Sequence, residues 1–506
     1  MSKSDSEFIF ETEPRSLGKI SVGRDMVEGK INFVGQVIQQ TDEVWNFKTD
    51  EKDFYYKLHS FTWLDDLAAL ASVEARLLAQ NWLHSWINKY SSGFGPGWTP
   101  ALTGMRLVRW THHYLFLTQG CSETKLKKFN LLLARQAKFL SMRAMSGPSG
   151  LPRFEALLGL IYAGCYLKNM EKFIEPATRA LADECHHLIN SEEIVFSRNS
   201  QDILNILTSL IWAKLALKDS KWNPSVTHLE TIEKLALIVR NLRHSDAGLP
   251  RFHGSCGDVD GQLDQALSHA ESREISLSET NVGYVKLSNS RTSVIIDAAP
   301  PLMGQEAVKA DASTLAFEMV SGQRRVFTSC GPGYLFGSDL SFSSRRTSSH
   351  CTVHIDNHDS SEFRSNEGWL QAPKKVIING PRTVPKEISS NEGTKIFEGA
   401  HDGYVKNFGL THVRKLKLSQ DGQSFEGEDL MIAIEDSHKR RFDKILKKSG
   451  STQMSVKAAF HLHPNVRVRF DRENNRVSLA LKNGELWFFS YSLDSYLQLE
   501  PTIFFE

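Results

Sequence analysis

Histidine, tyrosine and arginine side chains gather at three places in the last third of this chain of 506 residues. The three places are centred on His350, on residues 401–412 and on His461. Imidazole, phenol and guanidinium groups can bind an anion and transfer protons near neutral pH. The pattern therefore indicates a site that handles an acidic substrate.

The elements that must position these groups change in type along the chain. From about residue 54 to 245 the apolar residues recur at helical spacing, as in Leu64, Leu67 and Leu70, and glycine-proline segments separate the stripes. From about 280 onward, β-branched runs such as 293–297 and two-residue alternation such as 467–470 predict strands joined by tight turns.

This change predicts an α+β multidomain protein, with paired helices followed by an antiparallel β-sandwich. We expect an N-terminal extension over residues 1–50, a helical domain over 51–265 and a sandwich over 280–506. The segment 254–279 is rich in Gly, Ser and Asp and is interpreted as a linker. Because ligand clefts prefer domain junctions, the site is expected where the helices meet the sandwich.

The overall charge gives no support for nucleic-acid binding. The chain has 60 Lys and Arg residues against 59 Asp and Glu residues, so its formal net charge is +1. There is no global field to attract a polyanion, so one would need a local basic cleft. The sequence leaves the oligomeric state open.

The polar N-terminus and the scattered cysteines bear on the compartment. The first seven residues contain no apolar core of signal-peptide length, and no window of about 18 residues is free of charge. The six cysteines form no CxxC pair, which is typical of free thiols in a reducing compartment. We therefore expect a cytoplasmic protein without a transmembrane segment, with the periplasm as the alternative.

The ordered motifs resemble the heparinase II/III family of polysaccharide lyases. The resemblance covers roughly residue 50 to the end, and it rests on the three histidine segments together with 98–100, 106–110, 197–200 and 244–248. It implies an incomplete (α/α) toroid in front of the sandwich. It also implies an acidic polysaccharide or oligosaccharide as the partner, cleaved by β-elimination.

A lyase of this kind must neutralise a uronate carboxylate, remove the adjacent ring proton and assist the leaving oxygen. The resemblance implies Asn199 for the neutralisation, with Arg198 beside it as a substrate-binding residue. The alternative is that Asn199 only caps the helix predicted to start near Ser200.

The base is where this sequence departs from the family. Relatives place a tyrosine near the end of the toroid, whereas residues 248–254 here contain none. His253 is the nearest group able to accept a proton, and Tyr404 in the sandwich is the other candidate. A further departure is Asp311 with Ser313, where many relatives carry a histidine and an aspartate.

In the sandwich the resemblance implies His350 as a catalytic residue, with Arg346 and His401 binding substrate. Some members hold a structural zinc there, so His350 and His412 are candidate metal ligands with Glu367 as a possible oxygen donor. No cofactor is required for the lyase reaction itself.

Two functions remain open from the sequence. The first is a polysaccharide lyase acting on a uronate-containing glycan. The second is a catalytically inactive glycan-binding or envelope-associated protein that retains the lyase scaffold, which the missing tyrosine and the altered Asp311 strand both favour.

Overall fold

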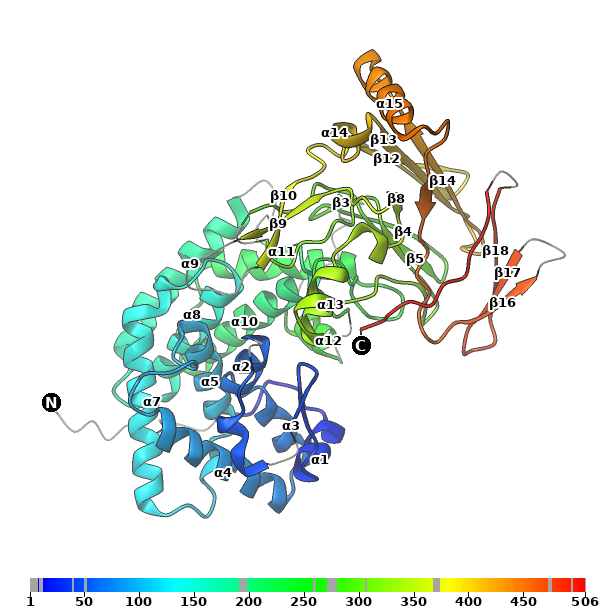
Figure 1. The fold of residues 1–506 in the computed structure, drawn as a ribbon. Helices are drawn as coiled ribbons and strands as arrows, with labels where there is room; N and C mark the ends of the chain where they lie inside the picture. The colour runs from blue at the N-terminus through cyan, green and yellow to red at the C-terminus, as the bar shows by residue number, and fades with distance from the viewer. Residues whose placement is uncertain are drawn as a thin grey trace.

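The computed structural model describes most of the chain (Figure 1). The described residues are 8, 12–38, 41–49, 52–190, 198–257, 261–270, 280–304, 307–366, 374–471, 476–492 and 495–505. Helices dominate up to residue 270, and strands dominate from residue 280. The predicted order of a helical half followed by a β half is therefore confirmed.

The helical half contains α1 to α12. Their bounds are α1 Ile20–Val27, α2 Lys52–His59, α3 Trp63–Leu70, α4 Val73–Tyr90, α5 Pro100–His112, α6 Tyr114–Thr118, α7 Glu123–Arg143, α8 Leu151–Tyr166, α9 Ile174–Asn190, α10 Ser200–Asp219, α11 Val226–Leu242 and α12 Gln262–Ala270. A short hairpin, β1 Ile31–Phe33 with β2 Gln36–Ile38, lies between α1 and α2.

The β half contains β3 to β18 and three further helices. The strands are β3 Thr280–Asn281, β4 Tyr284–Asn289, β5 Thr292–Asp297, β6 Phe317–Ser321, β7 Arg324–Phe327, β8 Val353–Ile355, β9 Glu362–Asn366, β10 Lys374–Asn379, β11 Lys386–Asn391, β12 Thr394–His401, β13 Thr411–Leu418, β14 Phe425–Ile432, β15 Val456–Ala458, β16 Arg467–Asp471, β17 Arg476–Ala480 and β18 Leu486–Ser490. The helices are α13 Ser338–Ser343, α14 Val405–Phe408 and α15 Asp436–Ser449.

The helical domain is an incomplete (α/α) toroid in which most residues of the helices α5, α8 and α10 are buried. The helices α5 and α8 approach so closely that a Cβ on Gly159 would lie 2.3 Å from the Cα of Gly104. Only glycine fits such a contact between two helix backbones. The tryptophans Trp63, Trp82, Trp86 and Trp110 are buried in this core, so they pack the toroid instead of lining a sugar-binding groove.

The second domain is an antiparallel β-sandwich. A five-stranded sheet runs in the order β3-β4-β5-β6-β7, a four-stranded sheet in the order β11-β12-β13-β14, and a three-stranded sheet in the order β16-β17-β18. Apolar side chains from all three sheets meet in one core, for example Val294, Leu416 and Leu479. Where apolar and polar residues alternate along a strand, one face of that strand is buried and the other is solvated.

The junction between the domains is more ordered than the sequence indicated. The segment interpreted as a linker contains α12, which packs against α10 and α11 of the toroid. Its glycine and serine content concealed a nine-residue amphipathic helix with Leu263, Ala266 and Ala270 buried. Within the described residues, no helix is long and apolar enough to cross a membrane.

Candidate functional site

His253 lies at the junction, in the loop that follows α11 and faces the sandwich. Its backbone N–H donates to the carboxylate of Asp311, and the Asp311 N–H donates in return to His253 Nδ1 at 3.0 Å. Because Nδ1 accepts, the hydrogen of the neutral ring is on Nε2. This Nε2 lies 3.2 Å from Asp297 Oδ2 but makes no hydrogen bond of good geometry within the described residues.

The backbone of His253 supports this placement of the ring. Its φ is +54°, and the next residue, Gly254, has a φ of +81°. A left-handed conformation is uncommon for a residue with a side chain, and the surrounding contacts must hold it in place. The loop is therefore shaped to bring the His253 ring against the sandwich.

His350 precedes β8 and reaches the same cluster from the sandwich side. Its Nδ1 lies 3.1 Å from Ser329 Oγ, and its Nε2 lies 3.8 Å from Asp311 Oδ2. The side chain is buried, with 1% of its residue surface exposed. Burial lowers the pKa of His350 to about 3, so the ring is neutral at pH 7 and carries no charge to offer a carboxylate.

Arg198 fills the space between the toroid and the first sheet of the sandwich. Its guanidinium pairs with the buried carboxylate of Asp297 and donates to the carbonyl oxygens of Gly283 at 3.0 Å and Pro300 at 3.2 Å. The ring of Tyr284 lies under it, 4.8 Å from centroid to guanidinium carbon. These contacts join the domains, and they leave 5% of Arg198 exposed.

Asn199 is the N-cap of α10. Its side-chain oxygen accepts from the backbone N–H of Gln201 at 2.9 Å and of Asp202 at 3.2 Å. Only 2% of the residue is exposed. The geometry is that of a helix cap, which favours the capping alternative over carboxylate neutralisation.

Tyr404 lies in a different cluster, at the start of α14 and among Ile355, Phe408 and Leu410. Its hydroxyl donates to the carbonyl oxygen of Val353 at 2.8 Å. Burial raises the pKa of Tyr404 far above the ordinary value for tyrosine. A phenol in this environment does not ionise near neutral pH, which is unfavourable for a base.

His401 and His412 face each other across β12 and β13, with 3.2 Å between His401 Nε2 and His412 Nδ1. His412 Nε2 lies 2.8 Å from Asp429 Oδ1, and Asp429 also accepts from Arg414 at 2.7 Å and 2.9 Å. Both histidines are buried, and burial lowers the pKa of each. This is a closed network in which every ring nitrogen has a neighbour, since His401 Nδ1 accepts from the Gly403 N–H.

The remaining predicted residues do not extend the cluster. Arg346 is half-buried and binds Asp359 and the carbonyl oxygen of Asn357. His350 and His412 belong to separate hydrogen-bond networks, and Glu367 lies outside the described residues. Among the residues that the structure describes, no three His, Cys, Asp or Glu groups gather closely enough to hold a metal ion. The zinc ligands stay a prediction.

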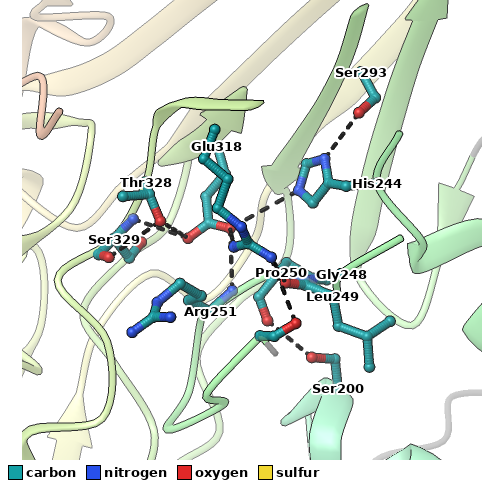
Figure 2. A network of polar contacts seen from close by, with 12 residues as sticks. Ser200, His244, Gly248, Leu249, Pro250, Arg251, Ser293, Glu318, Thr328 and Ser329 are labelled. Atoms are coloured by element: carbon teal, nitrogen blue, oxygen red, sulfur yellow. Dashed lines mark hydrogen bonds and ion pairs between the residues drawn. The ribbon is translucent and has the colours of Figure 1, made fainter. Parts of the chain in front are cut away.

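A second buried network at the junction was not predicted. Figure 2 shows Glu318, the second residue of β6, surrounded by groups from both domains. Its carboxylate accepts from the backbone N–H groups of Ser329 at 2.9 Å and Arg251 at 3.1 Å, and it lies 3.8 Å from His244 Nε2. His244 Nδ1 in turn lies 3.0 Å from Ser293 Oγ on β5.

Glu318 is fully buried, and burial raises its pKa. The signal in the sequence was a glutamate inside the apolar strand Phe317–Ser321, where a buried charge requires partners. The network attaches the 244–257 loop to β5 and β6, so the loop that carries His253 is fixed to the sandwich.

The structure thus brings together His253, His350, Asp311 and Asp297, with Arg198 attached through Asp297. It does not bring Tyr404, Arg346 or the His401–His412 pair into the same network. The cluster is polar, buried and placed between the toroid and the sandwich.

Comparison with known proteins agrees with this architecture. Residues 276–506 match the family model described as heparinase II/III-like, C-terminal. The β half of this chain is therefore similar to the C-terminal domain of the heparinase II/III family. One curated relative is FtsZ-localized protein C from Caulobacter vibrioides, which is 25% identical over 496 residues and matches 96% of this chain and 82% of its own length.

Solved structures support the fold. A crystal structure of heparinase III aligns with a TM-score of 0.62 at 16% identity, covering 89% of this chain and 71% of that one. A heparan sulfate lyase HepC mutant from Pedobacter heparinus aligns with a TM-score of 0.53 at 15% identity, covering 92% and 74%. At this identity the likeness establishes the shared toroid and sandwich.

Proposed function

We propose that this protein is a non-catalytic member of the heparinase II/III family. It keeps the lyase scaffold, and it acts by binding other molecules without turning them over. The proposal rests on one observation: the candidate catalytic groups are buried and bonded to other groups inside the protein. Asn199 caps α10, Tyr404 donates to a buried carbonyl, and His350 is a neutral, buried ring. A lyase needs these groups turned toward a sugar.

The name of one relative, FtsZ-localized protein C, supports a location in the cell for this binding. Its similarity extends over almost the whole of both domains and not only over the sandwich. We infer that the present chain associates with FtsZ-containing structures, because the name of the relative describes localization to FtsZ. This proposal concerns location and binding, and it requires no turnover.

Two assays test the proposal together. Purified protein is sedimented with FtsZ of the same organism, polymerised with GTP, and the pelleted fraction is compared with that in GDP. The same preparation is incubated with heparan sulfate, chondroitin sulfate and alginate while the ultraviolet absorbance of unsaturated uronates is followed. We expect GTP-dependent sedimentation and no absorbance rise.

A lyase acting on a uronate glycan is the second candidate, and one observation favours it. The Nε2 atoms of His253 and His350 are both buried without a hydrogen-bond partner among the described residues, and both rings contact one cluster around Asp311. In this reading His253 is the base. An absorbance rise that is lost in His253→Gln would establish the lyase and refute the non-catalytic proposal.

A further inference from the structure

One end of the sandwich carries an unusual basic helix. In Figure 1, α15 stands at the tip of the molecule beyond β13 and β14. Its sequence contains six lysine or arginine residues against two aspartates, and none of its residues is buried. Such a density of positive charge contrasts with the chain as a whole, whose formal net charge is +1.

The helix separates its charges from its apolar residues. Phe442 and Ile445 pack toward the small core that includes Tyr404 and Phe408. The other side carries a row of exposed cations at helical spacing: Arg440, Lys444, Lys447 and Lys448. Within the described part of the chain, none of these four side chains makes an ion pair or hydrogen bond.

The strand that leads into α15 also has a free edge. β14 is an edge of the four-stranded sheet, and within the described residues it pairs only with β13. Its first half carries Glu426 and Glu428 on the outer face, opposite Lys417 and Lys415 of β13. Charges of this kind are the usual protection of an edge strand against unwanted pairing.

The second half of β14 lacks this protection. Leu430 and Ile432 lie on the same outer face and are 43% and 40% exposed, and Ile434, just past the strand, is 66% exposed. An apolar, solvent-exposed edge beside a row of unpaired cations is a costly surface to leave bare. The sheet's other edge strand, β11, is also exposed, but its exposed residues are polar and include Lys386 and Glu387, so the exposed apolar side chains lie at the β14 edge.

We propose that β14 and α15 together form a docking surface for an extended, acidic peptide segment of a partner protein. The backbone of the peptide pairs with the free edge of β14, and its alternate apolar side chains cover Leu430 and Ile432. Its carboxylates lie against the cations of α15. Main-chain pairing supplies affinity and the charge complementarity supplies specificity, as in other strand-addition complexes.

A peptide fits this surface better than a lipid bilayer does. The apolar side of α15 is turned into the protein, so the helix cannot insert it among acyl chains as an interfacial helix does. A lipid also offers no partner for the unpaired backbone groups of β14, whereas a peptide strand satisfies them. The inference is independent of the function proposed above, because it concerns a different surface.

The test uses the full-length protein and a phage-displayed library of random peptides about twelve residues long, which suffices to span a strand and a helix turn. The strongest binder is synthesised with a fluorescent label, and its affinity is measured by anisotropy. We expect selected sequences rich in Asp and Glu that alternate with β-branched residues. Binding should weaken as salt rises between about 50 and 300 mM.

Two variants separate the parts of the surface. Lys444→Glu with Lys448→Glu should weaken binding by at least about tenfold, because it reverses the charges that the peptide meets. The matched control, Lys125→Glu with Lys128→Glu, makes the same charge change on exposed positions of α7 and should leave the affinity unchanged. Ile432→Lys adds a positive charge but blocks the edge, so strand pairing predicts weaker binding and simple electrostatics predicts stronger binding.

Four results would overturn the proposal. The first is a set of selected peptides without acidic enrichment, and the second is an affinity that the α15 variant leaves unchanged. The third is sedimentation with phosphatidylserine vesicles that the α15 variant abolishes while no peptide binds, which would identify a lipid-contact surface. A peptide methylated at alternate backbone nitrogens should lose binding in one of its two registers, and retention in both would refute strand addition.

Discussion

Replacing Arg198 by methionine distinguishes a residue that joins the domains from one that binds substrate. The guanidinium pairs with the buried carboxylate of Asp297 and donates to the carbonyls of Gly283, Ala299 and Pro300. Removing one partner of a buried pair leaves an uncompensated charge, which costs about 3–5 kcal/mol. Among the described residues, the Asp297 carboxylate then keeps its bond from Ser313 Oγ at 2.5 Å and its contact with His253.

We therefore expect Arg198→Met to lower the free energy of unfolding by about 3–5 kcal/mol, measured by urea denaturation with circular dichroism and tryptophan fluorescence. The matched control is Arg346→Met, because Arg346 also pairs with an aspartate but is half-buried at the surface. Its loss should cost only about 0–1 kcal/mol. The double variant Arg198→Met with Asp297→Leu should recover part of the loss, because no buried charge then remains.

A domain-joining role for Arg198 is refuted if the free energy of unfolding of Arg198→Met lies within about 0.5 kcal/mol of the wild-type value. That is the range of an ordinary surface substitution. Such a result, together with altered glycan binding, would assign Arg198 to a ligand. The probes must also be compared with each other, since two domains can unfold in separate steps.

Three further predictions concern the predicted site residues. His350→Ala should destabilise the fold by about 1–3 kcal/mol, because it leaves the buried Ser329 hydroxyl unpaired; an unchanged urea midpoint would contradict this. Tyr404→Phe should cost about 0.5–1.5 kcal/mol through the lost bond to the Val353 carbonyl; a fully stable variant with abolished glycan turnover would instead make Tyr404 catalytic. Burial raises the pKa of Asp311 to about 6, above an unfolded value of about 3.9, so its protonation favours the folded state. The contribution of this protonation to stability is complete below about pH 3.9 and is lost as the pH rises through about 6. Asp311→Asn should therefore reduce the difference in stability between about pH 4 and pH 7. An unaltered dependence of stability on pH would refute the assignment.

Periodicity was sufficient for much of the fold. The three-residue and four-residue spacing in the first half and the alternation in 467–470 depend on which face of an element is buried, and this is a local property. The predicted start of a helix near Ser200 coincides with α10, because Asn199 is a strong N-cap in any context. The segment 262–270 was missed, because its few apolar positions become a helix face only against α10 and α11.

For the candidate site, the residue types in the sequence indicated where the site lies but not which groups contact each other there. The resemblance pointed to His253 and His350, and the structure puts both against Asp311. The pairing of Arg198 with Asp297 joins residues 99 positions apart, and nothing in their sequence neighbourhoods specifies it. Glu318 was overlooked for the same reason, because its partners come from the 244–257 loop and from β7.

By itself, the sequence determined the order of the two domains, the type of each and the resemblance to the heparinase II/III family, because burial patterns and short motifs are written along the chain. Only the tertiary structure decided which polar groups are engaged inside the protein and with which partners. A histidine, an asparagine or a tyrosine has the same chemistry in either setting. Its protonation and its availability depend on burial and on partners that folding brings from distant segments.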